Sequence, residues 1–143
     1  MSDLVFDDKL SVGIDEIDED HQKLFDLFNL LKRSVEEGKA SGEQAEILEE
    51  LISFTTWHFS HEEQLMRQYG YDQAADHETE HWNLIGSAMQ LQQKFLDSGT
   101  IMADNHIEFL EGWLTNHIRG TDMKLGSYLS GMMSNSSEPD KAG

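Results

Sequence analysis

Apolar residues recur along most of the chain at alternating steps of three and four, which is the spacing of one face of an α-helix. Four segments show this pattern, and they are residues 19–37, 41–69, 73–96 and 101–119. Ser41 and Gln44 form a capping-box pattern at the start of the second segment, while Gly38 and Gly70 predict the ends of the first two. Four helices with short connections predict an up-down-up-down antiparallel four-helix bundle.

The two ends of the chain lack this pattern. Residues 1–17 show no sustained helical period, and we expect an extended arm that packs its apolar side chains on the bundle. The expected contacts of the arm are Val5, Phe6, Leu10, Val12 and Ile14. Residues 132–143 are rich in serine and other polar residues, and we expect them to form a disordered tail. The sequence therefore predicts an all-α fold with one domain over residues 1–131.

Six side chains that can bind a metal lie in phase with the apolar faces, and they are His21, His58, Glu62, His77, His81 and His117. In an antiparallel bundle, the starts of the first and third helices lie beside the ends of the second and fourth. The six side chains should therefore project inward at one level. Burying an imidazole or a carboxylate without a partner costs free energy, and a metal ion is one such partner. A hydrogen-bonded place in the core could explain any single histidine, but it is a poor account of five at one level.

Asp122 is a further candidate ligand near the end of the fourth helix. It follows His117 at a spacing that turns it about 140° away on a regular helix. Gly120 lies between the two residues, and we expect the helix to end or distort there. Asp122 can then turn back towards the histidines.

The spacing of these ligands predicts two adjoining metal sites. The three-histidine site consists of His77, His81 and His117, and the two-histidine site consists of His21 and His58. Glu62 and Asp122 can bridge the two metals. With a bridging oxo or hydroxo group, these donors leave one coordination position open on two octahedral metals, at the two-histidine site. Imidazole with oxygen ligands suits iron, whereas zinc prefers four ligands.

Composition excludes several other classes of function. The chain has 143 residues, a formal net charge of −18 and no cysteine. This acidity argues against binding nucleic acid or anionic lipid, since both need basic residues. The lack of cysteine excludes protein-held iron–sulfur clusters and thiolate zinc sites. No apolar run reaches the length of a membrane span, and the acidic start is not a signal peptide, so we expect a soluble cytoplasmic protein without a membrane partner.

Four stretches of the sequence resemble the hemerythrin family, and the resemblance covers about residues 5–130. The stretches are VGIDEIDEDH ending at His21, HFSHEE with His58 and Glu62, HETEH with His77 and His81, and WLTNHIRGTD with His117 and Asp122. Over this length the chain resembles the bacterial members of that family. The resemblance implies a four-helix bundle with a non-haem di-iron centre that binds dioxygen reversibly.

The resemblance also implies a role for each matched residue. His77, His81 and His117 would hold one iron, His21 and His58 would hold the iron with the open position, and Glu62 and Asp122 would bridge them. The implied cofactor is two iron ions, as Fe2+ or Fe3+, with a bridging oxo or hydroxo group. Leu114 would line the oxygen pocket, and Trp113 is a second candidate for its wall. Phe6 stands where the family often has tryptophan, and neither it nor His61 is an implied ligand.

The leading prediction is reversible dioxygen binding for carriage, storage or sensing, without catalysis. An alternative is a di-iron enzyme that acts on peroxide or nitric oxide, but the Glu-x-x-His motif of ferritin-like oxidases is absent. A mononuclear zinc protein with three histidine ligands is a further alternative, and it leaves His21, His58 and Glu62 unexplained. The sequence points to no protein partner.

Three other side chains are expected to lie outside the set of metal ligands. His106 lies about 16 Å from His117 along a helix axis, so it should lie at the other end of the bundle and bind no metal. His61 should lie at the edge of the ligand face, as an outer contact of the centre. Trp82 is expected to pack inside the bundle.

Overall fold

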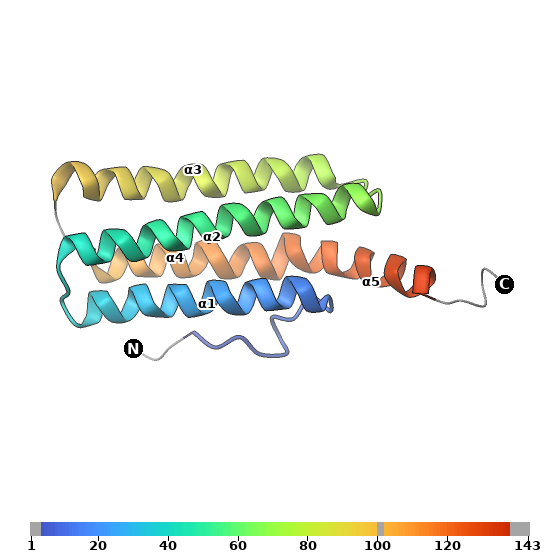
Figure 1. Cartoon of the computed structure of the whole chain (residues 1–143), viewed down its shortest axis with the longest axis horizontal. Helices are drawn as coiled ribbons and strands as arrows, with labels where there is room; N and C mark the ends of the chain where they lie inside the picture. Colours follow the sequence, from blue (N-terminus) through green and yellow to red (C-terminus); the bar gives the residue numbers. More distant parts are fainter. Residues whose placement is uncertain (1–3, 100–101, 138–143) are drawn as a thin grey trace.

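The computed structural model describes residues 4–99 and 102–137, with side chains up to residue 133. Its helices are α1 (Asp15–Glu36), α2 (Ser41–Gln68), α3 (Ala74–Ser98), α4 (Asp104–His117), the π-helix η1 (Ile118–Asp122) and α5 (Met123–Ser137). α4, η1 and α5 form one continuous rod, which runs beside α1, α2 and α3 in alternating directions (Figure 1). The predicted all-α antiparallel bundle is confirmed. None of the described helices has an apolar stretch long enough to cross a membrane.

α1 and α2 each end at a glycine in the left-handed conformation, as the sequence predicts, and α3 ends in the same way at Gly99. The φ angle is 66° at Gly38 after α1 and 63° at Gly70 after α2. The residue after each of these two glycines donates its N–H to the carbonyl five positions earlier, at 2.9 Å in both cases. These bonds satisfy carbonyl groups that the end of a helix would leave without a partner. Both helices therefore end sharply, and their partners can pack close beside them.

The capping box predicted at Ser41 is not formed, because α2 has no side-chain hydrogen bond at its N-terminus. Gln44 is instead buried between two loops. Its Nε2 donates to the carbonyl of Lys39 at 3.2 Å, and its Oε1 accepts from the N–H of Met102 at 2.8 Å. The capping-box prediction is wrong because Gln44 links segments that only the tertiary structure brings together.

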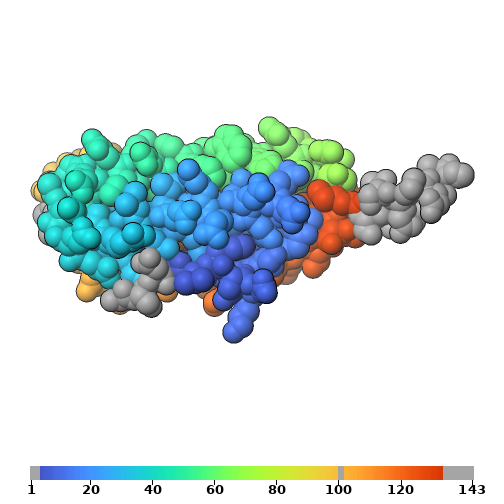
Figure 2. Space-filling view, turned by 60° about the horizontal axis from the view of Figure 1, so that its bottom comes forward, coloured from blue at the N-terminus to red at the C-terminus, as the bar shows by residue number. Residues whose placement is uncertain are grey.

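The arm over residues 4–14 is pinned to α1 by two polar side chains. Asn29 pairs with both backbone polar groups of Leu4, at 2.8 Å each. Asp18 accepts from the backbone N–H of Val12 at 2.9 Å. Figure 2 shows the arm crossing the surface between α1 and the C-terminal rod. The arm therefore joins the first and last helices of the bundle.

The apolar contacts of the arm largely match the prediction. The buried side chains are Leu10, Val12 and Ile14, while Phe6 is partly buried and meets Phe25 edge-on at 5.5 Å. Val5 is 66% exposed, so its predicted contact is wrong. The arm is also shorter than predicted, because α1 begins at Asp15.

α5 extends further than the sequence predicts. The helix includes residues 132–137, which were expected to open a disordered tail, and it projects beyond the bundle (Figure 1). Polar composition argued against helix there, but extending a helix that has already formed costs far less than starting one. Residues 138–143, the rest of that predicted tail, lie outside the described residues.

The start of α5 is fixed against two neighbours. The hydroxyl of Tyr128 donates to the carbonyls of Tyr69 and Gly70, at 2.6 and 3.1 Å, and so caps the end of α2. Gly126 lies directly under the arm. A Cβ added there would come within 2.2 Å of the Val12 carbonyl oxygen and 2.7 Å of its Cβ. Only a residue without a side chain lets the arm lie this close to α5.

Replacing Gly126 with alanine should destabilise the protein by about 1–3 kcal/mol, because the clash with Val12 must be relieved by moving the arm. Thermal or urea unfolding measures this change. Gly131→Ala is the matched control on the same helix, since a Cβ there meets nothing within 4 Å and should be neutral or stabilising. Equal stability of the two variants would contradict the close packing of the arm.

Candidate metal centre

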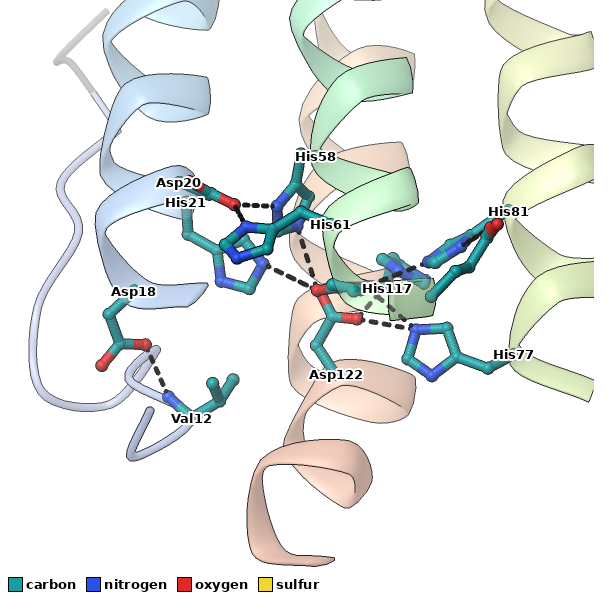
Figure 3. A network of polar contacts seen from close by, with 12 residues as sticks. Val12, Asp18, Asp20, His21, His58, His61, His77, His81, His117 and Asp122 are labelled. Atoms are coloured by element: carbon teal, nitrogen blue, oxygen red, sulfur yellow. Dashed lines mark hydrogen bonds and ion pairs between the residues drawn. The ribbon is translucent and has the colours of Figure 1, made fainter. Parts of the chain in front are cut away.

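Seven buried side chains meet at one end of the bundle, where the arm and the start of α5 close it (Figure 3). They are His21 from α1, His58 and Glu62 from α2, His77 and His81 from α3, His117 from α4 and Asp122 from η1. These are the residues that the sequence brought forward as ligands. The antiparallel arrangement brings them together because His21, His77 and His81 lie near the N-terminal ends of their helices, while the others lie towards the C-terminal end of α2, at the end of α4 or in η1.

Glu62 lies between two groups of imidazoles. Its Oε1 lies 3.1 Å from Nε2 of His77 and 3.0 Å from Nε2 of His81. Its Oε2 lies 3.0 Å from Nε2 of His58 and 3.6 Å from Nε2 of His21. Each oxygen of this one carboxylate therefore faces a different set of histidines.

Asp122 divides the histidines in the same way. Its Oδ1 lies 3.1 Å from Nε2 of His77 and 3.0 Å from Nε2 of His117. Its Oδ2 lies 2.9 Å from Nε2 of His21. In each of the two resulting sets, the possible ligand atoms all lie within 4.8 Å of one another. The centre thus consists of a three-histidine group and a two-histidine group that share both carboxylates.

The π-helix η1 explains how Asp122 reaches the centre. Hydrogen bonds in a π-helix join residues five apart, so His117 and Asp122 come to lie on nearly the same face. The distortion expected at this point is present, but Gly120 does not have a positive φ angle. A Cβ at Gly120 would also meet nothing within 4 Å. The wide turn of the π-helix therefore directs Asp122 towards the centre, without a glycine in the left-handed conformation.

Six polar atoms that face this centre lack hydrogen-bond partners among the described residues. They are Nε2 of His21, His58 and His117, Oε2 of Glu62 and both oxygens of Asp122. The short distances between these atoms lack hydrogen-bond geometry, as expected for atoms that converge on a shared ion, whereas Oε1 of Glu62 is hydrogen-bonded to Nε2 of both His77 and His81. Leaving so many buried polar atoms unpaired would be costly, and metal ions would satisfy them. Imidazole and carboxylate donors are a set that iron accepts, so the residues present fit the predicted metal.

Three of the histidines have a second carboxylate on the side away from the centre. Asp20 Oδ2 lies 2.8 Å from Nδ1 of His58, Glu63 Oε2 lies 2.9 Å from Nδ1 of His81, and Glu80 contacts Nδ1 of His117. Such a carboxylate holds the proton on Nδ1, leaves Nε2 free for a metal and makes the imidazole a stronger donor.

The ligand pattern in the sequence did not bring these outer carboxylates forward. A usable signal was present, because each of the three lies beside a candidate ligand in the sequence. Asp20 precedes His21, Glu63 follows Glu62, and Glu80 lies between the paired histidines of α3.

The carboxylates also control protonation of the metal-free centre. Burial lowers the pKa of His58, but Glu62 and Asp20 outweigh this effect and raise it to about 10. The same balance, with Asp122 as the main carboxylate, raises the pKa of His77 to about 9 and that of His117 to about 10. A metal must displace these protons when it binds.

A narrow cavity with almost wholly apolar walls adjoins the centre. Its lining residues are His21, Leu24, Thr55, His58, Phe59, Leu84, Trp113, Leu114, His117, Ile118 and Asp122. Both predicted pocket residues of α4, Trp113 and Leu114, therefore line it. Trp113 is held by a hydrogen bond from its indole nitrogen to the carbonyl of Leu84 at 2.8 Å. Sequence reasoning missed Phe59, whose ring stacks on His81 with centroids 3.7 Å apart.

The structure also shows the positions of His106, His61 and Trp82. His106 belongs to neither metal group, and its Nδ1 accepts the N–H of Ala103 at 3.0 Å at the start of α4. His61 is an outer contact of the centre, since its Nδ1 lies 2.6 Å from Asp20 Oδ2. The packing predicted for Trp82 is wrong, because its side chain is 79% exposed. On a helix, consecutive side chains point about 100° apart, so the residue after buried His81 turns towards solvent.

Comparison with known proteins gives one family. Residues 12–129 match the family model described as the hemerythrin HHE cation binding domain. Bacteriohemerythrin of Pseudomonas paraeruginosa is 35% identical over 122 residues, which are 85% of this chain and 78% of that protein. Bacteriohemerythrin of Methylococcus capsulatus is 34% identical over 116 residues, or 79% and 86% of the two chains. A crystal structure of wild-type hemerythrin superposes with a TM-score of 0.77 at 32% identity, covering 83% of this chain and 91% of that one.

The raised histidine pKa values predict opposite effects of pH on the metal-free and metal-loaded protein. In the metal-free protein, their stabilisation is complete below the unfolded pKa of about 6.5 and is lost as pH rises towards 9–10. Metal binding requires neutral imidazoles, so the stabilisation by metal should grow over the same range. Thermal melts of both forms from pH 6 to 10 should therefore diverge as pH rises. A gap between the two melting temperatures that stays constant would refute this coupling.

Proposed function

The chain belongs to the hemerythrin family, whose members bind dioxygen at a di-iron centre, and on that premise we propose that this chain holds two irons and binds dioxygen reversibly. The observation that carries the proposal is the position of Glu62 and Asp122. Each carboxylate offers one oxygen to the three-histidine group and the other to the two-histidine group. This is the arrangement that two bridged metal ions require.

The proposed ligand sets follow this division of the histidines. His77, His81 and His117 would hold one iron, and His21 and His58 would hold the other, while Glu62 and Asp122 would bridge them. A bridging oxo or hydroxo group would complete the centre and would leave one position open at the two-histidine iron. When bound, the irons supply the electrons that dioxygen takes up on binding and returns on release. The cavity beside the two-histidine group is the proposed place for dioxygen.

The residues around the cavity favour release of dioxygen over its consumption. Apart from groups of the centre itself, the described cavity wall has one hydroxyl, that of Thr55. That hydroxyl donates its proton to the Leu51 carbonyl at 2.6 Å. The Trp113 N–H is likewise occupied by the Leu84 carbonyl. Outside the groups of the centre, the described wall therefore disfavours water and offers no free proton donor, which supports a binding protein for carriage, storage or sensing rather than an enzyme.

The first test is the metal content. Protein produced with iron should contain two irons per chain, because the ligands form two groups. His77→Ala and His81→Ala should each lose iron, whereas His106→Ala should keep it, since His106 contacts neither group. Metal analysis decides this. One metal per chain, or zinc throughout, would support the mononuclear alternative.

The second test separates binding from catalysis. The reduced protein should develop a visible charge-transfer band on exposure to air and lose it on degassing, over repeated cycles. Absorbance with parallel measurement of dissolved oxygen follows both steps. Net consumption of dioxygen in each cycle, with turnover of peroxide or nitric oxide, would point to the enzyme alternative.

Leu114→Ser tests the apolar wall. It should leave the iron content unchanged and raise the autoxidation rate severalfold, because a hydroxyl in the wall admits water to the cavity. The decay of the charge-transfer band in air measures this rate.

Leu110→Ser is the control for Leu114→Ser. Leu110 is also buried on α4 but does not line the cavity, so its variant should lower the melting temperature without faster autoxidation. If the two variants decay at the same rate, Leu114 is ordinary core.

A further inference from the structure

Asp20 stands between two histidines on the outer side of the centre. Its Oδ2 lies 2.8 Å from Nδ1 of His58 and 2.6 Å from Nδ1 of His61 (Figure 3). Nε2 of His58 faces Glu62 at 3.0 Å, so a metal at Nε2 leaves the His58 proton on Nδ1. One carboxylate oxygen therefore accepts hydrogen bonds from both rings.

His61 is held in this position from its other side as well. Its Nε2 lies 2.7 Å from Oε1 of Glu16, a half-exposed carboxylate on α1. Its ring lies 5.4 Å from that of Trp57, at a tilt of 40°. The His61 side chain is itself 21% exposed, so it lies between the buried Asp20 and solvent. These contacts fix the ring so that Nδ1 points at Asp20.

The shared acceptor distinguishes His58 from the other ligands. Glu63 and Glu80 also accept from ligand histidines, but among the described residues neither contacts a second imidazole. Nδ1 of His21, the other member of the two-histidine group, has no hydrogen-bond partner in the described part of the chain. How strongly the two-histidine group donates electrons to a metal therefore depends on the strength of the hydrogen bond from His58 to Asp20.

We propose that His61 is a positioning residue, which competes with His58 for Asp20 and thereby weakens the electron donation of His58 to its iron. The proposal rests on the proposed function, since it takes His58 as an iron ligand. A stronger hydrogen bond from Nδ1 makes an imidazole more basic and favours the oxidised metal. His61 thus raises the reduction potential of the centre and speeds the release of dioxygen.

Opposite substitutions give opposite expected results. In His61→Leu, Asp20 accepts a hydrogen bond from His58 alone, so the reduction potential should fall and dioxygen dissociation should slow severalfold. In Asp20→Asn, His58 faces a weaker acceptor, so the potential should rise and dissociation should quicken. His61→Gln keeps an N–H donor for Asp20 and should lie near the parent. His106→Leu is the matched control at the far end of α4 and should change neither quantity.

The double variant of Asp20→Asn with His61→Leu tests whether the effect passes through Asp20. Redox titration and stopped-flow release of dioxygen should show that removing His61 changes little once Asp20 is replaced. An effect of His61 that persists undiminished in this background would reveal a through-space charge effect and overturn the proposal. The proposal would also be overturned if His61→Leu and Asp20→Asn shifted the reduction potential in the same direction, because a general loosening of the site would shift both potentials alike.

Iron content separates this inference from the proposed function. A parent protein without two irons or without reversible dioxygen binding contradicts the proposed function itself. A parent that binds dioxygen reversibly, with iron-loaded variants that match it in potential and dissociation rate, contradicts only the role of His61.

Discussion

Two buried carboxylates shared among five imidazoles are the constraint on which the rest of this structure depends. Glu62 and Asp122 are fully buried, and each has its two oxygens directed at different groups of histidines. Burying two negative charges this close together is costly unless cations and ligand bonds compensate them. The register of four helices and the wide turn of η1 together bring those compensating groups within reach.

The closed end of the bundle protects that polar centre from water. The arm crosses from α1 to α5 and brings Phe6 within 6.4 Å of the ring of His21. Gly126 allows the arm to approach α5, and Tyr128 ties α5 to the end of α2. These contacts are far apart in the sequence, so the centre is enclosed only when the whole chain has folded. The same enclosure leaves the cavity beside the two-histidine group apolar.

Some of the many acidic side chains of this chain contact the histidines of the centre from outside. Asp20, Glu63 and Glu80 each contact Nδ1, the outer nitrogen, of one histidine of the centre. Some carboxylates of this acidic chain therefore orient the imidazoles and strengthen them as donors.

The sequence by itself determined the bundle, its helix ends at Gly38 and Gly70, and which residues meet at the centre. Helical periodicity and antiparallel order are local or nearly local properties, so they can be read from spacing. Only the tertiary structure decided the acceptor at Nδ1 of each histidine, the stacking of Phe59 on His81 and the exposure of Trp82. It also decided that Gln44 links loops instead of capping α2. Such pairings join residues whose separation in the sequence has no fixed relation to their separation in space, and so no local pattern could predict them.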